Sequence, residues 1–201
     1  MVRVIAFDGE FSGRHAYVDS YYVVAWGLCV VDSAKPEEVV ASLRVCMQAP
    51  TERHRFARDC WDEFWQQDCM QAKLAEFRAE AVEPEAGMAA VLAFLREHVG
   101  DGTGCAVVCD FSFDALWMNY YLGAFTDAPA LHTFTGAYRS WPLITDDVYR
   151  GDLGVLDDWA LDARIDEKYG FTGIPKGTHD PEADAREIAV RFARYLHAKG
   201  Q

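Results

Sequence analysis

Apolar residues follow two different periods along this chain, and the changes between the periods predict its elements. Short β-branched or alternating runs indicate strands at 2–7, 21–32, 39–47 and 105–109, with 141–145 as a candidate fifth strand. Spacing of three and four dominates from about 55 to 100 and from 181 to about 199, which indicates helices.

The order of these elements predicts an α/β fold. The stretch 55–100 is expected to form two or three helices, broken near 67–68 and 83–84. A further helix should begin just after Asp110, and 152–173 is predicted as a short helix with loops. Antiparallel-type strands, then helices, then strand–helix alternation fit a mixed central sheet of about five strands flanked by helices. Because no repeat or Pro/Gly-rich linker interrupts the chain, residues 1–201 are predicted to be one domain with a helical insertion at about 55–100.

Composition agrees with a globular intracellular protein. The chain has 201 residues, of which 51% are hydrophobic and 25% charged, and no apolar run approaches the length of about 20 residues that spans a membrane. The N-terminal sequence MVRVIAFDGEF lacks the long apolar region of a signal peptide, so a cytoplasmic location is expected. The six cysteines are scattered without a CxxC pair, which favours buried free thiols.

A net charge of −13 limits the partners that this chain can take. Proteins that coat duplex DNA neutralise many phosphates with Lys and Arg, so the charge argues against that role. Holding a few terminal nucleotides needs far less positive charge, and bound metal ions change the sign of the local field. The acidity therefore excludes long-duplex binding more than phosphodiester chemistry.

Strand alternation places the two acids of the first run on one face. In residues 2–10 every second side chain points the same way, so Asp8 and Glu10 share a face with apolar neighbours. Two acids there are costly unless a positive charge lies between them, and a metal ion is the simplest such charge. An exposed edge strand is the alternative, because an acid pair would be harmless on it.

Asp114 begins an apolar stripe in the helix predicted after Asp110. The neighbours of Asp114 at helical spacing are Trp117, Met118, Tyr121, Leu122 and Phe125. Its side chain is therefore predicted to face inward, although the helix dipole also favours an acid in a first turn. Asp110 or Ser112 is expected to cap this helix.

The last helix has a well-marked start. Asp180 is predicted as its N-cap and Pro181 as its first residue. Asp184 then shares the inward stripe with Ile188, while His179 lies just before the cap. One helix end therefore supplies an acid in register with the core and a histidine able to lean over it.

In this order, the three motifs resemble the DEDDh exonucleases, a branch of the ribonuclease-H-like superfamily that includes proofreading exonucleases and oligoribonucleases. The motifs are residues 7–13 (FDGEFSG), 109–122 (CDFSFDALWMNYYL) and 178–186 (THDPEADAR). The resemblance covers nearly the whole chain and implies a ribonuclease-H-like fold.

Carried over by position, the resemblance implies a two-metal-ion 3′→5′ exonuclease. Asp8, Glu10 and Asp184 would hold one ion, and Asp8 would bridge to a second ion that Asp114 supports through water. His179 would be the general base that deprotonates the attacking water, a role that suits its ordinary pKa of about 6.5. Hard oxygen ligands fit Mg²⁺ or Mn²⁺ rather than zinc. The implied partner is the 3′ end of single-stranded or short nucleic acid, from which nucleoside 5′-monophosphates are released.

The residues after the acid pair are candidate substrate contacts. In the family that this sequence resembles, the residues corresponding to Phe11, Ser12 and Gly13 meet the terminal base and sugar. Phe11 would stack on the base, with an ordinary core position as the alternative, and Gly13 would allow close backbone approach. Asp110 competes with Asp114 as the acid of the second motif.

Aromatic and basic residues elsewhere carry less information. Trp61, Phe64 and Trp65 of the insertion have helical spacing, which favours simple packing. Candidate phosphate contacts are the cluster Arg53, His54, Arg55 and Arg58 and the isolated Arg139, Arg150 and Lys176. Ordinary surface charge is the alternative for each of these residues.

Two other functions are compatible with the motifs. One is a ribonuclease-H-like module that binds nucleic acid or protein without cleaving it, and the other is a phosphodiesterase for small substrates. No motif reports on the sugar 2′-hydroxyl, so the sequence leaves DNA and RNA open, as it does the oligomeric state.

Overall fold

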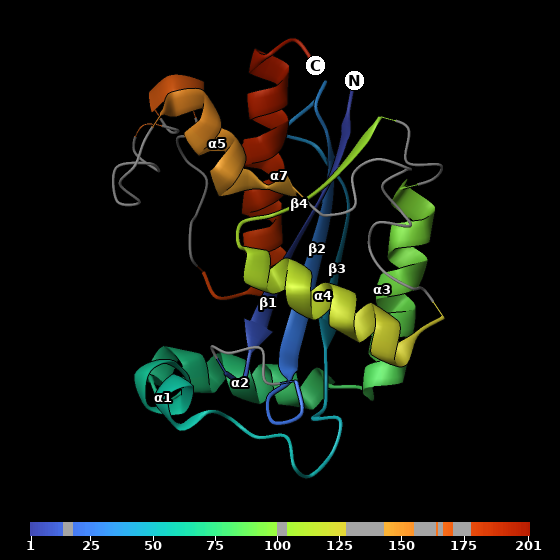
Figure 1. Cartoon of the computed structure of the whole chain (residues 1–201), viewed down its shortest axis with the longest axis vertical. Coiled ribbons are helices and arrows are strands. Elements are labelled where there is room, and N and C mark those ends of the chain that lie inside the picture. Colours follow the sequence, from blue (N-terminus) through green and yellow to red (C-terminus); the bar gives the residue numbers. More distant parts are fainter. Residues whose placement is uncertain (14–17, 100–103, 128–142, 155–163, 165–166, 171–177) are drawn as a thin grey trace.

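The computed structural model describes the chain except residues 14–17, 100–103, 128–142, 155–163, 165–166 and 171–177 (Figure 1). Its strands form a mixed five-stranded sheet in the order β3-β2-β1-β4-β5. β1 (Arg3–Phe11) pairs antiparallel with β2 (Val23–Asp32), which pairs antiparallel with β3 (Val39–Cys46). β4 (Cys105–Cys109) joins the other side of β1 in parallel, followed by β5 (Leu143–Ile144). The predicted α/β fold is confirmed, and the edge-strand alternative for Asp8 and Glu10 is wrong because β1 is central.

Helices cover both faces of this sheet. α3 (Pro84–Val99) and α4 (Ser112–Phe125) lie on one face, and α7 (Pro181–Ala198) packs along β1 and β2 on the other (Figure 1). Alternate residues of β1 divide between two cores. Ile5 packs with the residues of α3 and α4, whereas Val4 packs with those of α7.

The predicted helical insertion divides into two parts. α1 (Arg58–Cys60), the π-helical turn η1 (Trp61–Trp65) and α2 (Asp68–Glu80) lie beyond the end of β1, where they bury a third core (Figure 1). The third helix of the insertion, α3, instead belongs to the layer that covers the sheet. The breaks fall where the sequence predicts them, since α2 begins at Asp68 and α3 at Pro84.

The C-terminal half differs from the prediction in two places. β5 comprises two residues of the predicted 141–145, of which 141–142 lie outside the described residues. A helix that was not predicted, α5 (Thr145–Leu153), follows at once; polar residues dominate its sequence, and its buried residues are Thr145 and Tyr149. Most of the segment 152–173, predicted as a short helix with loops, lies outside the described residues.

All six cysteines are free thiols. Cys29, Cys46, Cys60 and Cys109 are buried, Cys105 is half-buried and Cys69 is exposed, so the prediction of burial is wrong for Cys69 and only partly met by Cys105. In the described part of the chain, no helix combines the length and the apolar character that a membrane span requires.

Candidate active site

The two acids of β1 lie on the face that α7 covers, near the strand's end. Glu10 is buried, with 7% of its surface exposed. Gly9 between them points to the opposite face, where an added Cβ would come within 2.6 Å of the Phe11 ring and 2.7 Å of the Trp26 ring. The glycine therefore lets an aromatic core close behind the acid pair.

A row of three residues across the sheet fixes the start of α7 beside these acids. Gly27 of β2 lies opposite Asp8, and Arg44 of β3 lies opposite Gly27. A Cβ at Gly27 would lie 1.9 Å from the carbonyl oxygen of Pro181, so a side chain there would displace the first turn of α7. Arg44, on the neighbouring strand β3, donates from Nη1 to Asp180 Oδ2 over 3.1 Å.

The segment before α7 folds back onto the helix that it begins. Asp180 is the N-cap, as predicted, and its Oδ1 accepts hydrogen bonds from two first-turn amides at 3.2 and 3.3 Å. The backbone amide and the hydroxyl of Thr178 both donate to Asp184 Oδ1 at 2.9 Å. His179 lies between Thr178 and the capping Asp180, and its φ of 53° is in the left-handed region.

These contacts bring His179 to the acid pair. Its Nδ1 lies 3.7 Å from Glu10 Oε1, and the Glu10 carboxylate raises the pKa of His179. The ring of Phe64 packs against the imidazole edge to face, with centroids 4.8 Å apart. One ligand atom each of Glu10, His179 and Asp184 lies within 4.8 Å of the others.

Asp114 reaches the same place from the first turn of α4. It is buried, with 4% of its surface exposed, and it heads the predicted apolar stripe. The predicted caps are wrong: Phe111 occupies the N-cap position, and no side chain caps the helix. Asp110 instead accepts a hydrogen bond from the hydroxyl of Thr145 at the start of α5.

The structure brings all five predicted acidic and imidazole residues to one cavity of about 530 Å³. These residues are Asp8, Glu10, Asp114, His179 and Asp184. The lining also includes Asp110 and the aromatic residues Phe11, Phe64, Phe111 and Phe113. The cavity therefore has an acidic floor at the end of β1 and aromatic walls.

Burial and mutual repulsion make this floor a strong site for positive charge. Burial and then the neighbouring carboxylates, Asp114 first, raise the pKa of Asp8 well above its usual range. Burial followed by the charge of Asp110 raises the pKa of Asp114 to about 8, and burial raises the pKa of Glu10. A divalent cation would relieve the repulsion, and an all-carboxylate set of hard oxygen donors fits Mg²⁺ or Mn²⁺.

The three predicted substrate contacts are placed differently from one another. Phe11 and Gly13 line the cavity, although Phe11 also packs on Trp26, Phe113 and Trp117. Ser12 is fully buried outside the lining; its hydroxyl accepts from the Tyr22 amide at 2.8 Å and donates to the Arg55 carbonyl at 3.0 Å. Both hydrogen bonds of the Ser12 hydroxyl hold the loop, so the structure places this side chain away from the cavity.

Among the candidate phosphate contacts, no described residue lines the cavity. Arg58 is 95% exposed beside Asp62, and both ring nitrogens of His54 have protein partners, the Thr51 hydroxyl and the Val18 carbonyl. Arg139 and Lys176 lie outside the described residues.

Sequence reasoning missed the residues that position the site from other elements. They are Gly27, Arg44 and Phe64. A glycine inside the apolar run of β2 is a recognisable signal of close backbone approach. Arg44 and Phe64 act through contacts between elements distant in sequence, for which no local pattern exists.

The chain has a ribonuclease-H-like α/β fold, which it shares with solved exonuclease structures. The nuclease domain of 3′hExo, a DEDDh family member solved with bound rAMP, has a TM-score of 0.67 at 12% identity, covering 98% of this chain and 92% of that one. Cell-death related nuclease 4 (CRN-4) has a TM-score of 0.66 at 14% identity, covering 98% and 64% of the two chains. E. coli Exonuclease I in complex with a dT13 oligonucleotide has a TM-score of 0.59 at 15% identity, covering 98% and 41%.

No protein-family model and no curated protein sequence matches the chain. The structural similarity at these identities establishes the fold, and the activity is argued from the site.

Proposed function

We propose that this chain is a metal-dependent 3′→5′ exonuclease that releases nucleoside 5′-monophosphates from the ends of single-stranded DNA or RNA. The observation that carries the proposal is the convergence of four carboxylates and one histidine, from β1, α4 and the start of α7, on a single cavity. Without a bound cation, a cluster of buried and half-buried carboxylates such as this one would be strongly destabilising, which supports a role in binding cations.

The donor set suits two divalent ions. Asp8, Glu10 and Asp184 would hold one ion, and Asp8 with Asp114 would hold the other. When bound, such ions stabilise the charge on the attacking and leaving oxygens of a phosphodiester. His179 would accept the proton of the attacking water; half of its side chain is exposed, so the proton can pass to solvent.

The rest of the cavity suits the end of a strand. Its volume of about 530 Å³ lies in the range of small-ligand sites, roughly 300–1,000 Å³, so a terminal nucleotide fits the site better than a duplex does. Phe111, which is 63% exposed, and Phe64 offer flat apolar surfaces to a base. The rAMP in the 3′hExo structure and the dT13 in the Exonuclease I structure support nucleic acid as the substrate class.

The test is a gel assay with 3′- and 5′-labelled single-stranded DNA and RNA in Mg²⁺, Mn²⁺ or EDTA. We expect metal-dependent shortening from the 3′ end, absent in EDTA. Asp8→Asn should lower the rate by about 10²–10³-fold or more, because it removes a charge that both ions need. Asp127→Asn, at an 83% exposed side chain, is the matched control and should leave the rate unchanged.

The assay also distinguishes the alternatives. Binding without metal-stimulated turnover on any end would identify a binding module. Turnover of dinucleotides but not of longer strands would identify a small-substrate phosphodiesterase.

A further inference from the structure

The cavity must admit an anion, yet its described lining contains no lysine or arginine. Every phosphate that approaches the acidic floor is repelled until a positive charge opposes it. Bound ions would supply part of that charge at the floor. A cation at the wall would be needed to guide the strand in from the side of the insertion.

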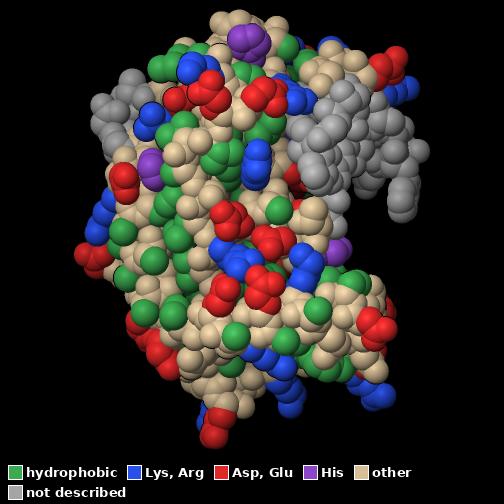
Figure 2. All heavy atoms as spheres, turned by 180° about the vertical axis from the view of Figure 1, so that it is seen from behind, with side chains coloured by type: hydrophobic (Ala, Val, Ile, Leu, Met, Phe, Trp, Pro, Cys, Tyr) green, Lys and Arg blue, Asp and Glu red, His purple; other side chains and the backbone are tan. Residues whose placement is uncertain are grey.

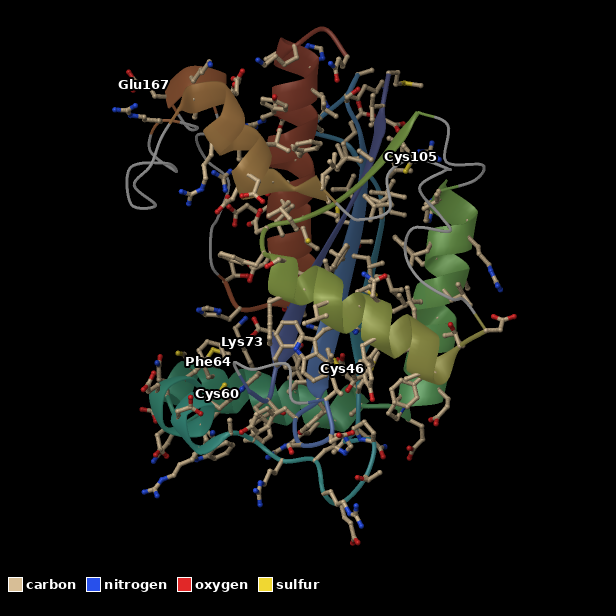
Figure 3. All side chains as sticks on the ribbon, viewed as in Figure 1. Cys46, Cys60, Phe64, Lys73, Cys105 and Glu167 are labelled. Carbon is tan, nitrogen blue, oxygen red and sulfur yellow. The ribbon has the colours of Figure 1, made fainter. Side chains whose placement is uncertain are left out.

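Lys73 of α2 lies on the side of its helix that faces the start of α7. Glu76 and Glu80 follow it at spacings of three and seven and so share its stripe. Both bind Arg44 Nη2, at 2.7 and 2.9 Å, and Arg44 Nη1 binds Asp180. In the view of Figure 3, the labelled Lys73 and Phe64 both lie on the insertion, below the start of α7.

The positive charge of Lys73 acts electrostatically on Glu10 and His179, two residues of the proposed active site. It lowers the pKa of both Glu10 and His179, in each case as a smaller effect than those of burial and of the Glu10–His179 contact. The side chain is half-buried, so its methylene stem lies against protein while the ammonium group remains free to meet a ligand.

Arg44 cannot do the same work, because three carboxylates already bind it. Lys73 makes no ion pair or hydrogen bond with any residue that the structure describes. The ammonium group of a half-buried lysine on this side of the insertion, without a carboxylate partner among those residues, is free to bind phosphate.

We infer that Lys73 binds a phosphate group of the nucleic-acid strand as the strand end enters the cavity, on the side where His179 and Glu10 lie. This inference rests on the proposed exonuclease function and adds a substrate-binding residue from the insertion. Lys73 and Phe64 then make the insertion a wall of the site, with a charge for the backbone and a ring beside His179.

The test compares Lys73→Gln and Lys73→Arg with the wild type, using single-stranded oligonucleotides at several salt concentrations. A hydrogen bond to a charged group contributes roughly 1.5–3 kcal/mol, so Lys73→Gln should lower kcat/KM about 10- to 100-fold, mainly through KM. Losing one phosphate contact should also reduce the slope of log(kcat/KM) against log[salt] by about 0.7. Lys73→Arg keeps the charge, so it should retain most of the wild-type kcat/KM and most of the wild-type salt slope.

Lys35→Gln is the matched control, because it removes the same charge at an exposed side chain that pairs with Glu38 in the turn after β2. It should change neither KM nor the salt slope. If Lys73→Gln behaves like Lys35→Gln while the wild type cleaves normally, the inference is overturned and the proposed function stands. If the wild type does not cleave, anisotropy of a labelled decamer decides: weaker binding and a smaller salt slope in Lys73→Gln support the phosphate contact, and equal binding overturns it.

Discussion

His179 holds a left-handed backbone, with a φ of 53°, in the segment that bends back onto Asp184. Residues other than glycine seldom adopt this region, and asparagine is among those that tolerate it best. Strain of this kind persists where the surroundings enforce it, and here Thr178 and the capping Asp180 do so. The conformation places the imidazole beside Glu10, with half of the side chain exposed to solvent.

We therefore predict that His179→Asn separates activity from stability. The asparagine tolerates the same backbone, so the Tm should stay the same or rise slightly. Loss of the general base should lower kcat by about 10²–10⁴-fold. Thermal unfolding and single-strand hydrolysis at neutral pH measure the two effects.

His98→Asn on α3, away from the cavity, is the control and should keep full activity. Wild-type kcat in His179→Asn would contradict the general-base role. If both Tm and activity fall sharply in His179→Asn, the loss of activity would instead indicate a structural role for His179.

At the scale of elements, the position of α7 depends on the row Asp8, Gly27 and Arg44 across three strands. Gly27 permits the close approach, and Arg44 binds the helix cap. Because Asp184 and His179 are both carried by this helix start, any shift of α7 moves two site residues relative to the two on β1.

Gly27→Ala should therefore damage stability and activity together. The new Cβ would lie 1.9–2.3 Å from backbone atoms of Pro181 and Glu182, which cannot rotate away as a side chain can. Overpacking of this kind costs about 1–3 kcal/mol, and a displacement of about 1 Å at a site can lower the rate roughly 100-fold. Denaturant unfolding and kcat/KM measure both.

Gly123→Ala in α4 is the matched control, since nothing lies within 4 Å of its added Cβ. Replacing this glycine in the last turn of α4 by alanine should stabilise the protein by up to about 0.5–1 kcal/mol and leave activity unchanged. A Gly27→Ala variant with the stability and activity of the wild type would show that α7 can relax without moving the site.

Several features of the site could be predicted from local sequence patterns. Periods of two and 3.6 correctly placed Asp8, Glu10, Asp114 and Asp184 on inward faces, because a face depends only on local geometry. The capping of α7 followed from Asp180 and Pro181 for the same reason. Local sequence patterns were therefore sufficient to predict most of the acidic residues on the cavity floor.

The parts that sequence reasoning missed depend on contacts between distant elements. Ser12 resembled a substrate contact, but its hydroxyl bonds to Tyr22 and Arg55, which the fold brings beside it. Phe64 had the spacing of a packing residue, yet the insertion places it against His179. The roles of the Ser12 loop and of Phe64 depend on contacts between distant elements, so the local spacing of residues could not predict them.

At the scale of the whole molecule, the net charge of −13 is spread over the surface as well as gathered in the site. Figure 2 shows acidic and basic side chains interspersed on the face opposite that of Figure 1, and the residues coloured there form no continuous basic band. A long duplex would find little to bind on this face, whereas a strand end needs only the cavity. The acidic cluster in that cavity should then dominate how stability responds to pH and to metal ions.

The last prediction concerns the metal-free protein, which should become less stable as pH rises. An acid whose pKa is higher in the folded state binds extra protons there, so its contribution is present at low pH and is lost as pH rises through the folded value. For Asp114 that window runs from its ordinary 3.8 to about 8, and the raised pKa values of Asp8, Glu10 and His179 act with the same sign. In EDTA, Tm should fall between pH 5.5 and pH 8.5. A fixed Mn²⁺ concentration, set at 100 times the Kd measured at pH 8.5, should raise Tm by roughly 5–10 °C at that pH and by less at pH 5.5, where protons compete for the carboxylates. Asp114→Asn should flatten the EDTA profile and reduce the Mn²⁺ shift, while the exposed Asp127→Asn should do neither. Equal Mn²⁺ shifts at both pH values, or parallel profiles for Asp114→Asn and the wild type, would contradict a cation site built on these buried carboxylates.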